Sequence, residues 1–161
     1  MLLFSPNLKL NLLMICLECK KELGYLDHKN AMDSAGVELC TKHYERIELL
    51  INKHDTPLEA IQLYYGLKEA GVNSMLEWWD GKKSIDIAIS RVKLNIEIDS
   101  QYDKLTEHEA INNLEHAMHS FKNGFTTIRI PHIVVRYYLN ETVNNIIGIM
   151  QGLKNNIKVI N

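Results

Sequence analysis

The stretch from Ser84 to Ser100 has the sequence SIDIAISRVKLNIEIDS and contains two runs in which apolar residues alternate with polar or small ones. In the first run Ile alternates with polar or small residues, and over residues 93–99 Leu and Ile alternate with Asn, Glu and Asp. A period of two predicts β-strands. Because only about Arg91 and Val92 separate the runs, we expect the two strands to form a hairpin.

The polar face of this hairpin is rich in carboxylates. With the loop at that place, Ala88 pairs with Asn95, Asp86 pairs with Glu97, and Asp99 lies two residues farther along the same face. Opposed like charges destabilise a sheet, and a bound Mg²⁺ would turn their repulsion into coordination. A solvated acidic face without a metal fits the spacing equally well.

The flanking segments extend this hairpin into a larger fold. A helix is expected to begin at Thr56-Pro57-Leu58-Glu59, where Thr caps the helix and Glu59 completes a capping box. It ends near Gly71, and residues 72–79 form a strand that leads to the Asp80-Gly81 turn. The three strands therefore form a meander preceded by a helix.

After the hairpin a second helix is expected over residues 106–122, again with a capping box, and its predicted buried stripe consists of Ile111, Leu114, Met118 and Phe121. A strand at 125–130 and a last helix at 141–153, capped by Asn140, follow. A helix between the third and fourth strands allows a parallel crossover. We therefore expect an α/β fold in which helices flank a mixed sheet.

Near the N-terminus, two ligand pairs have the spacing of a zinc site. Cys16 and Cys19 form a C-x-x-C, and twenty residues later Cys40 and His43 form a C-x-x-H. Two such pairs can wrap one tetrahedral Zn²⁺, and four protein ligands make the site closed and therefore structural. Gly24 and Gly36 would let a hairpin turn between the pairs, and the second pair would lead into a helix, as in treble-clef-like fingers. His28 is a weaker fifth candidate, which we expect to be solvated.

Composition fits an ordinary globular protein. The chain has 161 residues, 46% of them hydrophobic and 24% charged, and a formal net charge of −2, which gives no overall attraction to nucleic acid. Three cysteines, an odd number, suit a reducing compartment, and we expect a cytoplasmic location with no membrane contact. We divide the chain into an N-terminal extension at 1–13, a zinc-binding module at 14–54 and a larger domain at 55–161.

The hairpin sequence, followed by a helix and then by GFTTIRIP, resembles the PD-(D/E)XK nuclease superfamily, and most of all its Vsr-like branch of very-short-patch-repair-type endonucleases. The resemblance covers about residues 56–152 and implies a restriction-endonuclease-like αβββαβ core. It also implies a catalytic Mg²⁺ or Mn²⁺, DNA as the partner, a bacterial or phage origin, and a homodimer as one option.

The resemblance assigns roles to individual residues. Asp86 matches the first metal-binding Asp, Glu97 matches the acidic residue of the (D/E)-x-K element, and Glu59 matches a Glu that can complete the metal shell. Arg129 matches the basic residue at the end of the fourth core strand and would contact nucleic acid. Asp99 occupies the position of the motif lysine, as in the IE-x-DG form of this branch.

Two departures concern the catalytic machinery. Ser100 replaces the usual Gly, and Asp103 stands near the place of a His that the branch often carries. Another group would then activate water or stabilise charge on the phosphate, and the candidates are Gln101, Lys104, Asn112 and His116. Lys104 is also a candidate for nucleic-acid binding.

Three functions follow from these features. The leading expectation is a metal-dependent endonuclease in which a zinc finger positions the nuclease domain or contacts the nucleic acid. The alternative is a catalytically inactive protein of nuclease fold that binds nucleic acid or regulates. In the third, the zinc finger binds a protein partner.

Overall fold

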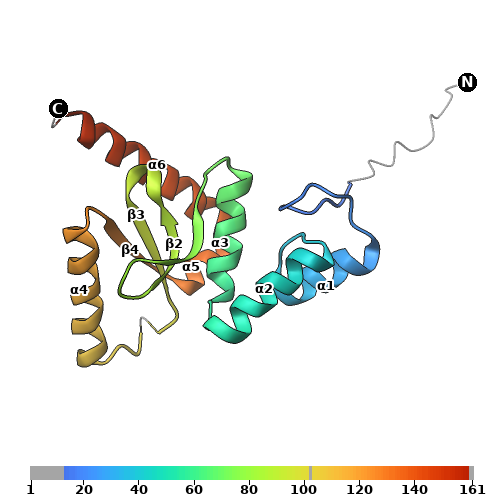
Figure 1. Ribbon diagram of the computed structural model, residues 1–161, viewed down its shortest axis with the longest axis horizontal. Helices are drawn as coiled ribbons and strands as arrows, with labels where there is room; N and C mark the ends of the chain where they lie inside the picture. Colours follow the sequence, from blue (N-terminus) through green and yellow to red (C-terminus); the bar gives the residue numbers. More distant parts are fainter. Residues whose placement is uncertain (1–12, 102, 160–161) are drawn as a thin grey trace, which may run out of the picture. The chain divides into compact units, whose positions relative to one another are not determined.

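The computed structural model describes residues 13–101 and 103–159 of the chain. The chain divides into two compact units, Met1–Tyr44 and Glu45–Asn161, so the boundary falls inside a helix, ten residues before the one drawn from the sequence. Apart from Leu13, the N-terminal extension expected at 1–13 lies outside the described residues. Figure 1 shows the helices and strands of both units.

The first unit consists of a tight turn and the helices that follow it. The backbone N–H of Cys16 donates to the carbonyl oxygen of Lys21 at 2.8 Å and closes the turn. Helix α1 spans Tyr25–Ala35, and helix α2 spans Thr41–His54 and continues into the second unit. The hairpin expected between the two ligand pairs is wrong, because α1 occupies that segment. Gly36 ends α1 in the left-handed region, with φ 66°, where glycine carries no steric penalty.

The second unit holds the described strands and most of the described helices. In chain order its elements are α3 (Leu58–Glu69), β1 (Met75–Trp79), β2 (Ser84–Ile89), the 3₁₀ turn η1 (Ser90–Val92), β3 (Leu94–Asp99), α4 (Glu107–Lys122), β4 (Thr126–Pro131), α5 (His132–Tyr137) and α6 (Leu139–Val159). The order from α3 to β4 agrees with the prediction. The short helix α5 is not predicted, since six residues are too few for a clear period, and α6 begins at Leu139 rather than after a cap at Asn140.

The sheet is mixed, with strand order β1-β2-β3-β4. β2 and β3 are antiparallel with Ala88 opposite Asn95, which confirms the predicted register. β4 runs parallel to β3 and places Arg129 opposite Glu97. The helix α4 supplies the crossover that this parallel pair needs.

One face of the sheet forms the hydrophobic core with α3, α5 and α6 (Figure 1). The apolar face of the hairpin is buried there and contributes Ile87, Ile89, Leu94, Ile96 and Ile98. Helix α4 covers the other face, where Asn95 is fully buried and its Nδ2 donates to Ser120 Oγ at 3.3 Å. The carboxylates of the hairpin therefore lie on the α4 side.

The buried stripe expected on α4 is wrong. Phe121 is 74% exposed and Leu114 is 65% exposed, and Ile111 and Met118 also lie at the surface. The helix turns Ser120 toward the sheet instead, because the strand surface that it meets carries Asn95 and carboxylates rather than apolar side chains. Its N-terminal capping box between Thr106 and Glu109 forms as predicted.

The start of α3 also differs from the prediction. The helix begins at Leu58 after Pro57, and Thr56 makes no side-chain cap. The Thr56 hydroxyl bonds to Glu77 Oε1 at 2.6 Å instead. Thr56 is buried, and its hydroxyl therefore ties the entrance of α3 to strand β1.

Candidate functional site

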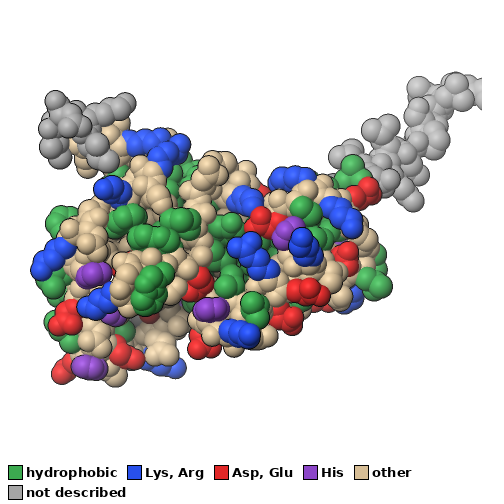
Figure 2. All heavy atoms as spheres, in the orientation of Figure 1, with side chains coloured by type: hydrophobic (Ala, Val, Ile, Leu, Met, Phe, Trp, Pro, Cys, Tyr) green, Lys and Arg blue, Asp and Glu red, His purple; other side chains and the backbone are tan. Residues whose placement is uncertain are grey.

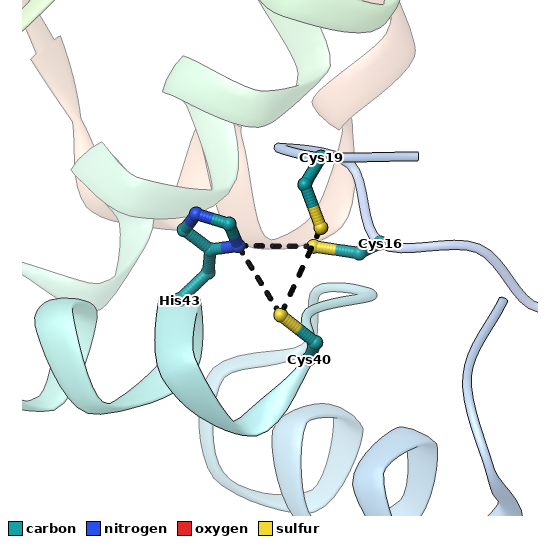
Figure 3. Close-up of side chains that lie close together, drawn as sticks. All are labelled: Cys16, Cys19, Cys40 and His43. Carbon is teal, nitrogen blue, oxygen red and sulfur yellow. Dashed lines mark hydrogen bonds between the residues drawn. The ribbon is translucent and has the colours of Figure 1, made fainter. Parts of the chain in front are cut away.

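Four side chains of the first unit converge on one point (Figure 3). Cys16 and Cys19 come from the tight turn, Cys40 directly precedes α2, and His43 lies in the first turn of α2. The predicted pairs are thus brought together by the turn and by the start of one helix. The helix that follows the second pair agrees with the expectation, although it begins already at Thr41.

The distances fit a single tetrahedral ion. All four ligand atoms lie within 4.8 Å of one another. His43 Nδ1 is 3.5 Å from Cys16 Sγ and 3.2 Å from Cys40 Sγ, and the Sγ atoms of Cys19 and Cys40 are 3.9 Å apart. With Zn–S bonds of about 2.3 Å and Zn–N bonds of about 2.0 Å, ligand atoms of a tetrahedral site are roughly 3.5–3.8 Å apart. The group could therefore hold a metal such as zinc.

The backbone prepares the sulfur atoms for this role. Burial opposes ionisation of the Cys16 thiol, but backbone amides of Cys19, Cys40 and Glu18 outweigh it and lower the pKa of Cys16 to about 6. Burial raises the pKa of Cys40, and the neighbouring cysteine sulfurs raise it further. One thiolate is therefore favoured before any cation binds, and a bound cation would favour the others.

The expectation that His28 is solvated is wrong, because the side chain pairs with a carboxylate. Its Nδ1 lies 2.6 Å from Glu38 Oε2, and both side chains are partly buried. His28 therefore links α1 to the segment before Cys40 and is occupied by a carboxylate.

On the hairpin, Asp86 lies one residue before the β2–β3 ladder, which begins with the pair Ile87 and Ile96. Its Oδ2 accepts the backbone N–H of Ile98 at 2.7 Å. Burial raises the pKa of Asp86 to about 7, and the charges of Glu97 and Glu77 add to the rise, against the Ile98 amide and Lys83. Its surroundings therefore favour the protonated form of Asp86 far more than water does.

The partner of Glu97 is a lysine that the sequence analysis does not single out. Glu97 is only 7% exposed, and its Oε1 lies 2.5 Å from Lys83 Nζ. Lys83 directly precedes β2, at the end of the turn that starts with Asp80. The available signal was a basic residue three positions before Asp86, at the end of the hairpin where the carboxylates lie.

Glu77 is a second residue that the sequence analysis does not consider. It has a left-handed backbone with φ 51°, which is unusual for a non-glycine residue inside a strand. Its carboxylate bonds to the hydroxyls of Thr56 and Ser84. Glu77 contributes to the raised pKa of Asp86, so it belongs to the same electrostatic environment.

Asp99 and Arg129, which the resemblance assigns separately, form an ion pair. Arg129 Nε lies 3.9 Å from Asp99 Oδ2, and Asp99 Oδ1 accepts the backbone N–H of Gln101 at 3.0 Å. Asp99, which stands where the motif of the resembled family has a lysine, is thus paired with an arginine of the neighbouring strand β4. Lys104 lies exposed in the loop before α4.

Glu59 forms an ion pair with the arginine side chain of Arg136. It is 7% exposed, and its Oε1 accepts from Arg136 Nη2 at 2.5 Å and from Nε at 3.1 Å. This two-pronged contact joins α3 to α5. The structure therefore places Glu59 in an ion pair with Arg136, whereas Glu97 pairs with Lys83.

Helix α4 presents a histidine to the acidic face. His116 lies one turn before Ser120, which contacts Asn95 of β3. Burial lowers the pKa of His116, and the positive charges of Lys83 and Lys82 lower it further, against the charges of Glu97 and Asp80. Of the four residues suggested for the missing catalytic group, His116 is therefore within electrostatic reach of Glu97.

The surface charge is mixed. Figure 2 shows acidic and basic side chains interspersed on the face in view.

Within residues 13–101 and 103–159, Cys16, Cys19, Cys40 and His43 are the only group of three or more Cys, His, Asp or Glu side chains close enough to share an ion. Neither Asp99 nor Glu59 therefore joins Asp86 and Glu97 in such a group. Asp86 and Glu97 are left as a pair, and Mg²⁺ is commonly held by one or two carboxylates with water.

None of the described helices is both long and apolar enough to cross a membrane. Comparison of the chain with protein-family models, with curated proteins and with solved structures gives no match.

Proposed function

We propose that the protein is a metal-dependent nuclease that hydrolyses phosphodiester bonds in DNA. The observation that supports this most is the group formed by Asp86, Glu97 and Lys83. Asp86 Oδ2 accepts from Ile98, directly after Glu97, and Lys83 Nζ lies 2.5 Å from Glu97. Two acids and a lysine are the side chains of the motif that the hairpin sequence resembles, with the lysine supplied from another position.

The donor set suits a hard divalent cation. Asp86 and Glu97 would hold Mg²⁺ or Mn²⁺ through carboxylate oxygens, with water and substrate completing the shell. When bound, such an ion lowers the pKa of a coordinated water and neutralises charge on the phosphate. Asp86 would lose its proton on binding, because its pKa of about 7 reflects burial and neighbouring acids in the metal-free protein.

The proposed core is restriction-endonuclease-like. Its support is the order α3, β1, β2, β3, α4, β4, in which an antiparallel meander is followed by a parallel fourth strand. The carboxylates lie on the face of the hairpin that α4 covers, and Arg129 lies opposite Glu97 on the neighbouring strand. Arg129 and the exposed Lys104 are the proposed phosphate contacts.

The proposed metal of the first unit is a structural Zn²⁺ in a treble-clef-like module. Three cysteines and one histidine leave no coordination position for substrate in a tetrahedral site. The module would therefore position the nuclease domain or contact the nucleic acid, and would take no part in hydrolysis.

Cleavage assays test the proposed site. Supercoiled plasmid and single-stranded DNA are incubated with Mg²⁺ or Mn²⁺ and with wild type, Asp86→Asn or Glu97→Gln, substitutions that keep shape and remove charge. We expect each to slow cleavage by about hundredfold or more. Glu69→Gln, at the exposed end of α3, is the matched control and should cleave as wild type. Cleavage that survives both site substitutions would show that the residues are wrongly assigned.

One observation favours the inactive alternative. The lysine position of the motif holds Asp99, which is paired with Arg129. A wild-type protein that binds DNA in a salt-sensitive manner but never cleaves it would support a nucleic-acid-binding role. Absence of binding would instead favour a protein-interaction role for the zinc module.

A further inference from the structure

We infer that Lys83 is the catalytic lysine of this site. We also infer that its ammonium group pairs with the Glu97 carboxylate until a divalent cation binds there and takes its place. This inference rests on the proposed nuclease function for its catalytic half. Its other half, competition between Lys83 and the divalent cation, concerns metal binding and is measurable without any substrate.

The first support is the contact itself. Lys83 Nζ is 2.5 Å from Glu97 Oε1, and the two side chains are only 23% and 10% exposed. A carboxylate this far from solvent needs a partner, because an unpaired buried charge is costly.

The second support is the way the backbone holds Lys83. Asp80 Oδ1 accepts the backbone N–H groups of Lys82 at 2.7 Å and Lys83 at 2.8 Å, which fixes the turn. The backbone of Lys83 is therefore anchored, whereas its four-carbon side chain can rotate.

Lys83 and a divalent cation therefore compete for the carboxylate of Glu97. Two positive charges a few ångströms apart in a partly buried site repel strongly. Cation binding would therefore release the ammonium group from Glu97, and from its anchored backbone it could contact the phosphate of a bound substrate. Lys83 would thus weaken metal affinity while increasing the rate of hydrolysis.

Opposite effects on affinity and rate distinguish this role from a structural one. Mn²⁺ affinity is measured by electron paramagnetic resonance on the zinc-loaded full chain, and cleavage is measured at saturating Mn²⁺. We expect Lys83→Met to bind Mn²⁺ about tenfold more tightly, because a repelling charge is removed. We also expect it to cleave about hundredfold more slowly.

Two further variants control for position and charge. Lys82→Met removes a charge one residue away that forms no ion pair with Glu97, and it should leave affinity and rate near wild type. Lys83→Arg keeps the positive charge and should keep the weak affinity of the wild type even if its rate falls. Tryptophan fluorescence of each variant checks folding, since Trp78 and Trp79 both lie in the second unit.

The outcomes separate this inference from the proposed function. Unchanged or weaker Mn²⁺ affinity in Lys83→Met would overturn the competition, and so would a Lys83→Arg variant that binds Mn²⁺ more tightly than wild type. Normal cleavage by Lys83→Met at saturating Mn²⁺ would overturn the catalytic role while the nuclease function stood. Tighter Mn²⁺ binding by Lys83→Met in a protein that cleaves nothing would uphold the competition and overturn the nuclease function.

Discussion

Replacing Asp86 by Asn should stabilise the second unit at alkaline pH and have little effect at acid pH. Burial raises the pKa of Asp86 from 3.8 to about 7 in the folded protein. Between these values the unfolded chain ionises Asp86 while the folded chain keeps it protonated. The stabilising contribution is thus complete below pH 3.8 and is lost as pH rises through about 7. Asn cannot ionise, and its amide oxygen can still accept the N–H of Ile98.

The expected magnitude follows from the shift. About three pKa units at about 1.4 kcal/mol each give an upper limit of about 4 kcal/mol above pH 8. Asp86 is partly reached by solvent, which screens the effect, so we expect Asp86→Asn to gain about 2–3 kcal/mol at pH 8.5. Near pH 4 the difference between the two proteins should fall below about 0.5 kcal/mol.

Urea unfolding followed by tryptophan fluorescence measures this gain. Both tryptophans lie in β1, so the signal reports on the second unit in the full chain. The buffer is freed of divalent cations by resin rather than by a chelator, so that the first unit keeps its metal. A gain of 2–3 kcal/mol corresponds to a midpoint shift of about 1–2 M urea.

Two results would refute the reasoning. One is an Asp86→Asn variant that is no more stable than wild type at pH 8.5. The other is a gain that is as large at pH 4 as at pH 8.5, because the effect would then not come from ionisation of this carboxyl. As a control, Glu69→Asn changes an exposed carboxylate at the end of α3 and should show no comparable pH dependence.

Other substitutions test the remaining parts of the fold. Cys16→Ser should abolish bound zinc and reduce helical circular dichroism, while the urea midpoint seen by tryptophan stays within about 0.3 M of wild type; a large midpoint change would contradict the division into units. Phe121→Ala, at a 74% exposed side chain, should cost less than about 1 kcal/mol, whereas Leu94→Ala in the core should cost about 2–5 kcal/mol; equal costs would mean that the face of α4 is misplaced. Gly148→Ala meets no atom within 4 Å and should stabilise α6 by about 0.5–1 kcal/mol, whereas Gly66→Leu would strike Val143 and destabilise; urea unfolding decides both.

The hairpin is predictable from sequence because its information is local. Alternation over residues 84–99 separates the Ile and Leu face from the carboxylate face, and a short link leaves one register, with Ala88 opposite Asn95. The Cys3His group is predictable for a similar reason. Ligands three residues apart can be aimed at one point by a single turn, as Cys16 and Cys19 are.

Other features needed the tertiary structure. The pattern of α4 predicts a buried stripe that includes Phe121, yet the helix buries Ser120 against a polar strand surface. A period shows that a helix has two faces, but the surface that it meets decides which face is buried. Likewise, Thr56 has the sequence of a helix cap but bonds to Glu77 of β1.

Sequence by itself determined the hairpin, its register and the four converging ligands, since each depends on backbone geometry over a few residues. Only the tertiary structure decided which cation serves each buried acid. Glu59 pairs with Arg136, 77 residues away, and Glu97 pairs with Lys83 from a turn of the sheet. The physical reason is that a buried carboxylate pairs with whichever cationic side chain the folded chain places next to it. The number of residues between two elements does not give the distance between their side chains in space.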